Sequence, residues 1–175
     1  MKRTFTLVAL ALLVSSTGCG QQQPAQPQQS AATPSGTQYL LAEEPQDAQD
    51  VINLRENAQD DESVTVIGRI GGSQNPWVEG RAAFSIVDLS LKACSDIEGD
   101  TCKMPWDYCC QTDLLPKATV LVKFVDDSGN LLGTDSRQLL AVKELDTVVV
   151  SGKAKRDDAG NLTVLADKIY VKNES

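Results

Sequence analysis

The sequence predicts an all-β domain, a five-stranded barrel with a long cysteine-bearing insertion between its second and third strands and a short helix before it. From residue 63 onward, apolar and polar residues alternate with the period of two that a half-buried strand requires. β-branched residues are frequent in these runs, and turn-forming clusters at residues 127–130 and 157–161 separate them. A chain of 175 residues is long enough for one such domain and additional segments.

The alternation gives each predicted strand an inward face. In the second strand Phe84 and Ile86 share one face, whereas Val87 lies on the opposite, outward face. In the last strand the alternation breaks at residues 167–168 and resumes at Ile169, so we expect the strand to change phase there. The five predicted strands span residues 64–70, 81–88, 118–125, 147–154 and 162–171.

The order of the predicted elements indicates a particular barrel. A short helix is expected around residues 138–145, between the third and fourth strands. Three strands, a helix and two strands is the order found in OB-fold barrels, and Gly68 suits a first strand that bends to serve both sides of the barrel. The stretch 62–173 therefore resembles bacterial OB-fold domains, a resemblance that implies the fold and does not specify the function.

The N-terminal residues have the pattern of an export signal. Two basic residues precede an apolar run over residues 5–14, which is too short to span a bilayer and is typical of a signal peptide. The small residues that lead to Cys19 resemble the lipobox of bacterial lipoproteins. That resemblance implies a signal peptide over residues 1–18 and a lipid anchor on Cys19. Ser16 stands where that family usually has leucine, which leaves ordinary signal-peptidase cleavage as the alternative.

The segment after Cys19 is predicted to be a tether. Residues 19–45 begin with a Gln/Pro-rich tract that has no apolar periodicity, so we expect a flexible stalk. Residues 46–60 follow Pro45 and begin with acidic side chains, as the first turn of a helix favours. We expect a short helix there that packs on the barrel or covers one end of it.

The connection between the second and third strands contains four of the five cysteines. Outside the cytoplasm, four cysteines in a small domain most often form two disulfides. Cys109 and Cys110 are adjacent and too close along the chain to pair readily, so Cys94 and Cys102 would each pair with one of them, in either pattern. The alternative is a copper or zinc site that uses all four thiolates as ligands, although the spacing departs from paired C-x₂₋₄-C motifs.

Composition excludes several functions. The chain has no histidine, which rules out Ser-His-Asp and Cys-His catalysis and His-ligated zinc, and no other catalytic constellation is present, so we expect neither an enzyme nor a cofactor. The formal net charge is −8, and the domain has no basic footprint for nucleic acid. Trp77, Trp106 and Tyr108 are the candidate binding surface, although Trp77 is also expected to anchor its loop on the barrel.

These features together predict a non-enzymatic lipoprotein of the cell envelope. The stretch from Gly68 to Asp88, with the later segment 105–110, resembles uncharacterised lipoproteins of the planctomycete type, a family from which no activity carries over. The expected function is an OB-type binding or interaction module on the periplasmic or extracytoplasmic face. Its expected partners are the membrane, through the lipid anchor, and a protein of the envelope.

Export is directly testable by cell fractionation with mass spectrometry of the recovered chain. We expect the mature protein in the membrane fraction, without residues 1–18, because the leader is removed and Cys19 is lipidated. Recovery of the full-length chain from the cytosol, with its leader attached, would contradict the prediction.

Overall fold

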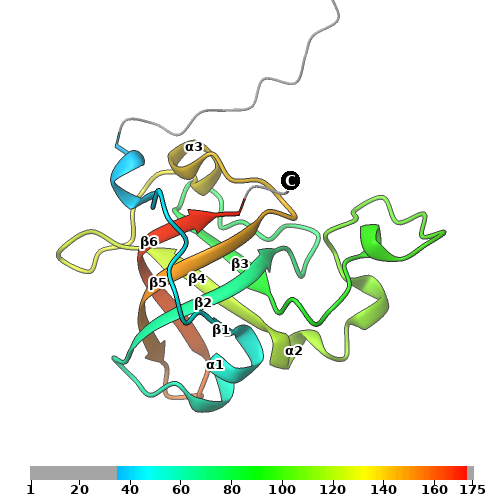
Figure 1. Ribbon diagram of the computed structural model, residues 1–175, viewed down its shortest axis with the longest axis horizontal. Coiled ribbons are helices and arrows are strands. Elements are labelled where there is room, and N and C mark those ends of the chain that lie inside the picture. The colour runs from blue at the N-terminus through cyan, green and yellow to red at the C-terminus, as the bar shows by residue number, and fades with distance from the viewer. Residues whose placement is uncertain (1–34, 173–175) are drawn as a thin grey trace, which may run out of the picture.

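The computed structural model describes residues 35–172 (Figure 1). The predicted signal peptide, Cys19 and the predicted tether as far as residue 34 lie outside the described residues. Over the described part, no helix combines the length and apolar character that crossing a membrane requires.

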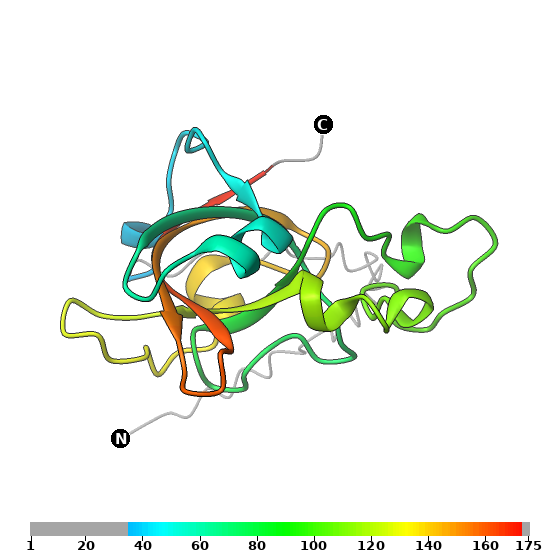
Figure 2. The ribbon, with the colours of Figure 1, turned by 90° about the horizontal axis from the view of Figure 1, so that it is seen from below.

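Five strands close into a barrel, which confirms the predicted all-β, OB-like fold (Figures 1 and 2). Strand β2 pairs antiparallel with both β3 and β5, β3 with β4, and β5 with β6. The ring closes through β4 and β6, which run parallel. The barrel strands are β2 (Ser63–Ile70), β3 (Ala83–Val87), β4 (Thr119–Phe124), β5 (Thr147–Arg156) and β6 (Leu162–Val171).

Short elements connect and flank these strands. A two-residue strand, β1 (Gln49–Asp50), pairs with β2 in parallel. The helix predicted around residues 138–145, between the third and fourth barrel strands, is present between β4 and β5 but begins and ends earlier than expected. The helices are η1 (Thr37–Tyr39), α1 (Val51–Asn57), η2 (Cys94–Asp96), η3 (Cys109–Gln111), α2 (Leu115–Ala118) and α3 (Ser136–Leu140).

Helix α1 is shorter than the predicted 46–60. It begins after Asp50, whose side chain accepts a hydrogen bond from the Asn53 N–H at 2.7 Å and so caps the helix. Val51 and Leu54 are fully buried in the barrel core. The helix therefore covers part of the barrel, as the sequence suggested, with Asp50 rather than Pro45 marking its start.

The predicted tether, residues 19–45, extends too far toward the C-terminus, because residues 37–41 contact the barrel. Leu41 N–H donates to the Ile169 carbonyl at 2.8 Å, and the ring of Tyr39 meets that of Phe124 edge-on at 5.7 Å. These contacts hold residues 37–41 on the barrel, because an aromatic ring and a leucine in an otherwise polar segment provide apolar surface to bury.

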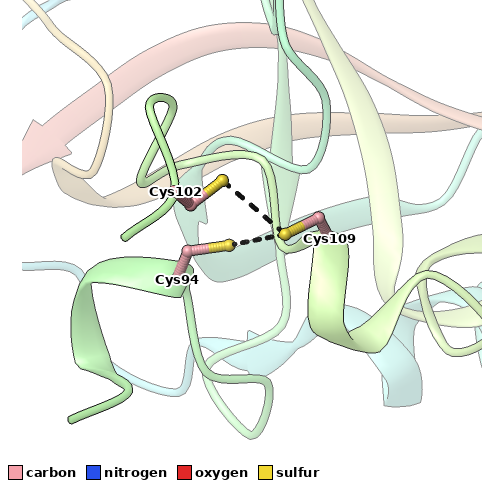
Figure 3. Close-up of side chains that lie close together, drawn as sticks. All are labelled: Cys94, Cys102 and Cys109. Carbon is pink, nitrogen blue, oxygen red and sulfur yellow. Dashed lines mark hydrogen bonds between the residues drawn. The ribbon is translucent and has the colours of Figure 1, made fainter. Parts of the chain in front are cut away.

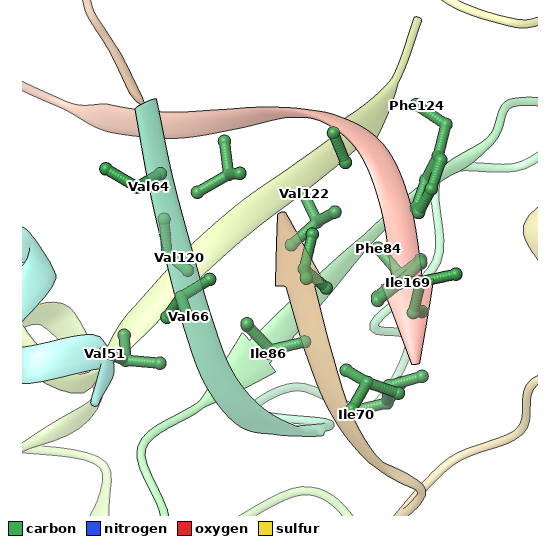
Figure 4. Close-up of a cluster of buried hydrophobic side chains, with 14 of the residues drawn as sticks. Val51, Val64, Val66, Ile70, Phe84, Ile86, Val120, Val122, Phe124 and Ile169 are labelled. Atoms are coloured by element: carbon green, nitrogen blue, oxygen red, sulfur yellow. The ribbon is translucent and has the colours of Figure 1, made fainter. Parts of the chain in front are cut away.

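The barrel interior is filled by the residues that the alternation placed there. Phe84, Ile86, Val122 and Phe124 are fully buried and lie together in the core (Figure 4). In β6 the register against β5 shifts at Asp167, which has no partner opposite it, while Ala166 and Ile169 both face inward. The predicted change of phase is therefore confirmed as a β-bulge.

Gly152 is required where β5 crosses this bulge. A Cβ added there would lie 2.2 Å from the Leu165 carbonyl oxygen and 2.8 Å from the Ala166 Cα. Both neighbours are backbone atoms of the paired strand, so the clash is relieved only if the strands separate.

We expect Gly152→Ala to lower the free energy of unfolding by at least about 3 kcal/mol, because overpacking against backbone is costly. Lys153→Ala, at the next, exposed position of the same strand, is the matched control and should change it by less than about 0.5 kcal/mol. Urea unfolding measures both, and equal stabilities of the two variants would contradict the assignment.

Candidate thiol centre

The insertion packs on the outer face of β3. Val87, predicted to face outward, is fully buried there, as is Tyr108. These side chains form a second apolar cluster, separate from the barrel core, which also contains Leu91, Ala93 and Ala118. The insertion is thereby held beside the barrel, on the side of α2 (Figures 1 and 2).

Asp88 fixes the beginning of the insertion. Its carboxylate accepts hydrogen bonds from the Ser90 N–H at 2.9 Å and the Ser90 hydroxyl at 2.7 Å, and from the Ile52 N–H of α1 at 2.9 Å. The side chain is almost completely buried. Burial alone would raise the pKa of Asp88, but these hydrogen bonds outweigh it and lower the pKa, so the group is a carboxylate at neutral pH.

Tyr108 is fully buried and anchors the insertion. The prediction that it belongs to a binding surface is therefore wrong. Burial raises the pKa of Tyr108 to about 12, so its hydroxyl stays neutral. Its backbone is left-handed, with φ 56° and ψ 29°, an unusual conformation for a bulky residue. Such strain is retained where surrounding packing enforces it, often at functional sites.

Two glycines directly after β2 leave room for Tyr108 and the backbone before it. Gly72 N–H donates to the Trp106 carbonyl at 2.9 Å. A Cβ on Gly71 would lie 2.8 Å from the same carbonyl oxygen and 3.0 Å from Cε2 of Tyr108. The Gly71-Gly72 pair therefore lets the insertion approach the barrel backbone closely, which larger residues would prevent.

An ion pair fixes the other side of the insertion. Arg69 of β2 contacts Asp96 of η2 at 2.6 Å, and Asp96 also accepts a hydrogen bond from the Ala93 N–H at 3.1 Å. Because Arg69 is only partly exposed, the pair is partly protected from solvent screening. It orients the turn that begins with Cys94.

All four predicted cysteines converge at this place. The Cys109 sulfur lies 3.3 Å from that of Cys94 and 3.6 Å from that of Cys102 (Figure 3). It lies 4.0 Å from that of Cys110. None of these pairs is at the roughly 2.05 Å of a disulfide bond, and the four thiols are free in the structure. Cysteines separated by up to sixteen positions are thus brought into one cluster around Cys109.

The cluster has a buried and an exposed side. Cys94 is buried, Cys102 is half-buried, and Cys109 and Cys110 are exposed. Burial alone would raise the pKa of Cys94, but hydrogen bonds from the Cys109 thiol and backbone and from the Cys102 thiol outweigh it, so the pKa is lowered. The pKa of Cys109 is raised, because its thiol donates to Cys94. Cys94 is therefore the first of these two thiols to ionise.

Asp100 is a further potential ligand, from an acidic run, residues 96–100, whose alternating carboxylates suggest a calcium site but favour a solvated loop. One carboxylate oxygen accepts a hydrogen bond from the Cys102 N–H, and the other lies 3.7 Å from the Cys110 sulfur. The structure thus contains two sets of three ligand atoms that lie within 4.8 Å of one another. The first consists of Cys94, Cys102 and Cys109, and the second of Cys94, Asp100 and Cys110.

The two tryptophans have separate positions. Trp77 is only 6% exposed; its indole N–H donates to Glu144 at 2.6 Å, and its ring packs on Phe84 with the Arg137 guanidinium 5.4 Å above it. Trp77 therefore anchors its loop, as the sequence also indicated, and is too deeply buried to form a binding surface. Trp106 is half-buried and donates to the Gln74 carbonyl at 3.2 Å, which ties the insertion to the loop after β2.

No protein-family model matches the chain, and a search of curated proteins found no match. The chemistry of the site therefore rests on its own residues.

We expect Tyr108→Ala to lower the free energy of unfolding by about 3–5 kcal/mol, because it removes a fully buried ring. It should also release the insertion and speed alkylation of Cys94. Tyr108→Phe keeps the ring and should change the stability by less than about 1 kcal/mol. Thermal unfolding and timed alkylation measure both effects, and an alanine variant that matches the wild type would show that the ring is not the anchor.

Proposed function

We propose that this chain is a lipid-anchored, extracytoplasmic OB-type module whose ligand is a thiophilic metal ion. The observation that carries the proposal is the convergence of three sulfur atoms, from Cys94, Cys102 and Cys109, within 4.8 Å of one another. The protein's role is to bind and hand on the ion, without chemistry on a substrate.

The sulfur spacing supports a metal ligand set. In a tetrahedral zinc site with bonds of about 2.3 Å, neighbouring sulfurs are roughly 3.8 Å apart. The distances from Cys109 to Cys94 and Cys102 are 3.3 and 3.6 Å, so small side-chain movements would place an ion between them. With histidine absent from the chain, thiolates are its soft ligands, and they select Cu(I) and Zn²⁺ over harder ions.

The position of the cluster supports exchange of the ion. Cys94 forms a buried floor, while Cys109 and Cys110 face solvent on an insertion that projects from the barrel (Figure 2). An ion held there is accessible to a partner that offers its own sulfur ligands. The proposed anchor, Cys19, would keep the module at the membrane surface, and the Gln/Pro-rich composition of the segment after it is that of a spacer.

A second candidate is an interaction module stapled by two disulfides. The 3.3 Å distance between the Cys94 and Cys109 sulfurs favours it, because a modest rotation would allow the bond. Cys102 would then pair with Cys110. The stapled insertion would present Trp106, which is half-buried, to a protein of the envelope.

Protein isolated from its native envelope without oxygen distinguishes the two candidates by elemental analysis and alkylation. We expect at least one copper or zinc ion per chain and four alkylatable thiols once the metal is removed. Cys109→Ser should lose the ion held by Cys94, Cys102 and Cys109, because Cys109 contacts both other sulfurs of this set. Lys103→Ala, at an exposed position beside Cys102, is the control and should retain it. Metal-free protein with the mass deficit of two disulfides would overturn the proposal in favour of the stapled module.

A further inference from the structure

We propose that the thiol centre binds two Cu(I) ions, with the Cys94 sulfur shared between them. This inference rests on the proposed function and specifies its ligand. One ion would lie among Cys94, Cys102 and Cys109, and the other among Cys94, Asp100 and Cys110.

The number of donors favours two ions. Four sulfurs and one carboxylate oxygen converge here, because Asp100 lies 3.7 Å from the Cys110 sulfur. A single tetrahedral ion uses four ligands, which leaves one of the five without a role. Cu(I) is satisfied by two or three soft donors, so two such ions use all five if one donor is shared.

The place of Cys94 suits a shared ligand. It is the one residue that belongs to both three-atom sets, and it lies at the buried floor between them. Cys102 and Cys109 complete the first set, and Asp100 and Cys110 complete the second. A thiolate has several lone pairs and can bridge two soft cations.

The charges of the centre also suit monovalent ions. Four thiolates, the Asp100 carboxylate and two Cu(I) ions carry a net charge of −3, the same as these five groups around one Zn²⁺. Binding of the two ions releases the four thiol protons to solvent, and no electron is transferred. Two Zn²⁺ ions would need more donors than this centre supplies, since each prefers four ligands.

The two positions differ in their donors. The first offers sulfur alone, whereas the second includes the carboxylate of Asp100, a harder donor and a poorer match for Cu(I). We therefore infer that the second ion is held more weakly, and that it is the ion that leaves first. Exposure does not separate the two sets, because each contains one buried, one half-buried and one exposed donor, so the difference rests on the carboxylate.

Titration of the reduced, membrane-extracted protein with Cu(I), followed by native mass spectrometry, tests the inference. We expect two ions on the wild type and one on Cys110→Ser. Asp100→Asn keeps an oxygen that can accept the Cys102 hydrogen bond, and should weaken the second ion by about tenfold. Glu98→Gln, an exposed acid in the same turn, is the control and should bind two ions with unchanged affinity.

Each result decides between the proposals. A wild type that takes one ion, with a Cys110→Ser variant that also takes one, overturns the two-ion centre and leaves the metal-binding function standing. A wild type that takes no Cu(I) while fully reduced overturns both. Circular dichroism of each variant establishes that the barrel is folded, as expected because the cysteines lie outside both apolar clusters.

Discussion

The burial of Tyr108 against Val87 is the contact on which the site depends. A β3 strand with a polar outer face would leave the insertion unattached, and the cysteines would then lie on a loop with no fixed geometry. Instead, both residues are fully buried, and Gly71 and Gly72 let the insertion backbone approach the end of β2. The thiols therefore converge as a consequence of apolar packing, before any metal or disulfide joins them.

The barrel was largely predictable because apolar and polar residues alternate along its strands. Alternation in β3, β4 and β6 identified Phe84, Val122 and Ile169 as inward, and the break at Asp167 correctly indicated the bulge. The short elements were predicted less well. The capping bond of Asp50 sets the start of α1, and the edge-on contact of Tyr39 with Phe124 attaches a segment that by composition resembled a tether. Both depend on tertiary contacts that local sequence does not contain.

The site was predictable in its residues but only partly in its arrangement. Counting cysteines in one long connection was enough to identify the cluster, yet the gaps of seven, six and no residues match no familiar ligand spacing. The convergence on Cys109 follows from the left-handed turn at Tyr108. This conformation could not be predicted from the sequence, because tyrosine rarely adopts it. Aromatic character suggested that Tyr108 would bind a partner, whereas it is a buried anchor. Trp77 is buried too, in the role of loop anchor that its position in the sequence also indicated. The acidic run 96–100 suggested a calcium site, with a solvated loop as the favoured interpretation, so the place of Asp100 beside the thiols was not expected.

The central claim is that packing preorganises the thiol centre, and amide hydrogen exchange at Gly72 tests it most directly. This amide donates to the Trp106 carbonyl and so reports on whether the insertion lies against the barrel. In fully reduced, metal-free protein, the account predicts strong protection at Gly72, close to that of amides within the barrel strands. Exchange at the rate of an unstructured loop, with protection gained only after metal binding or oxidation, would contradict it.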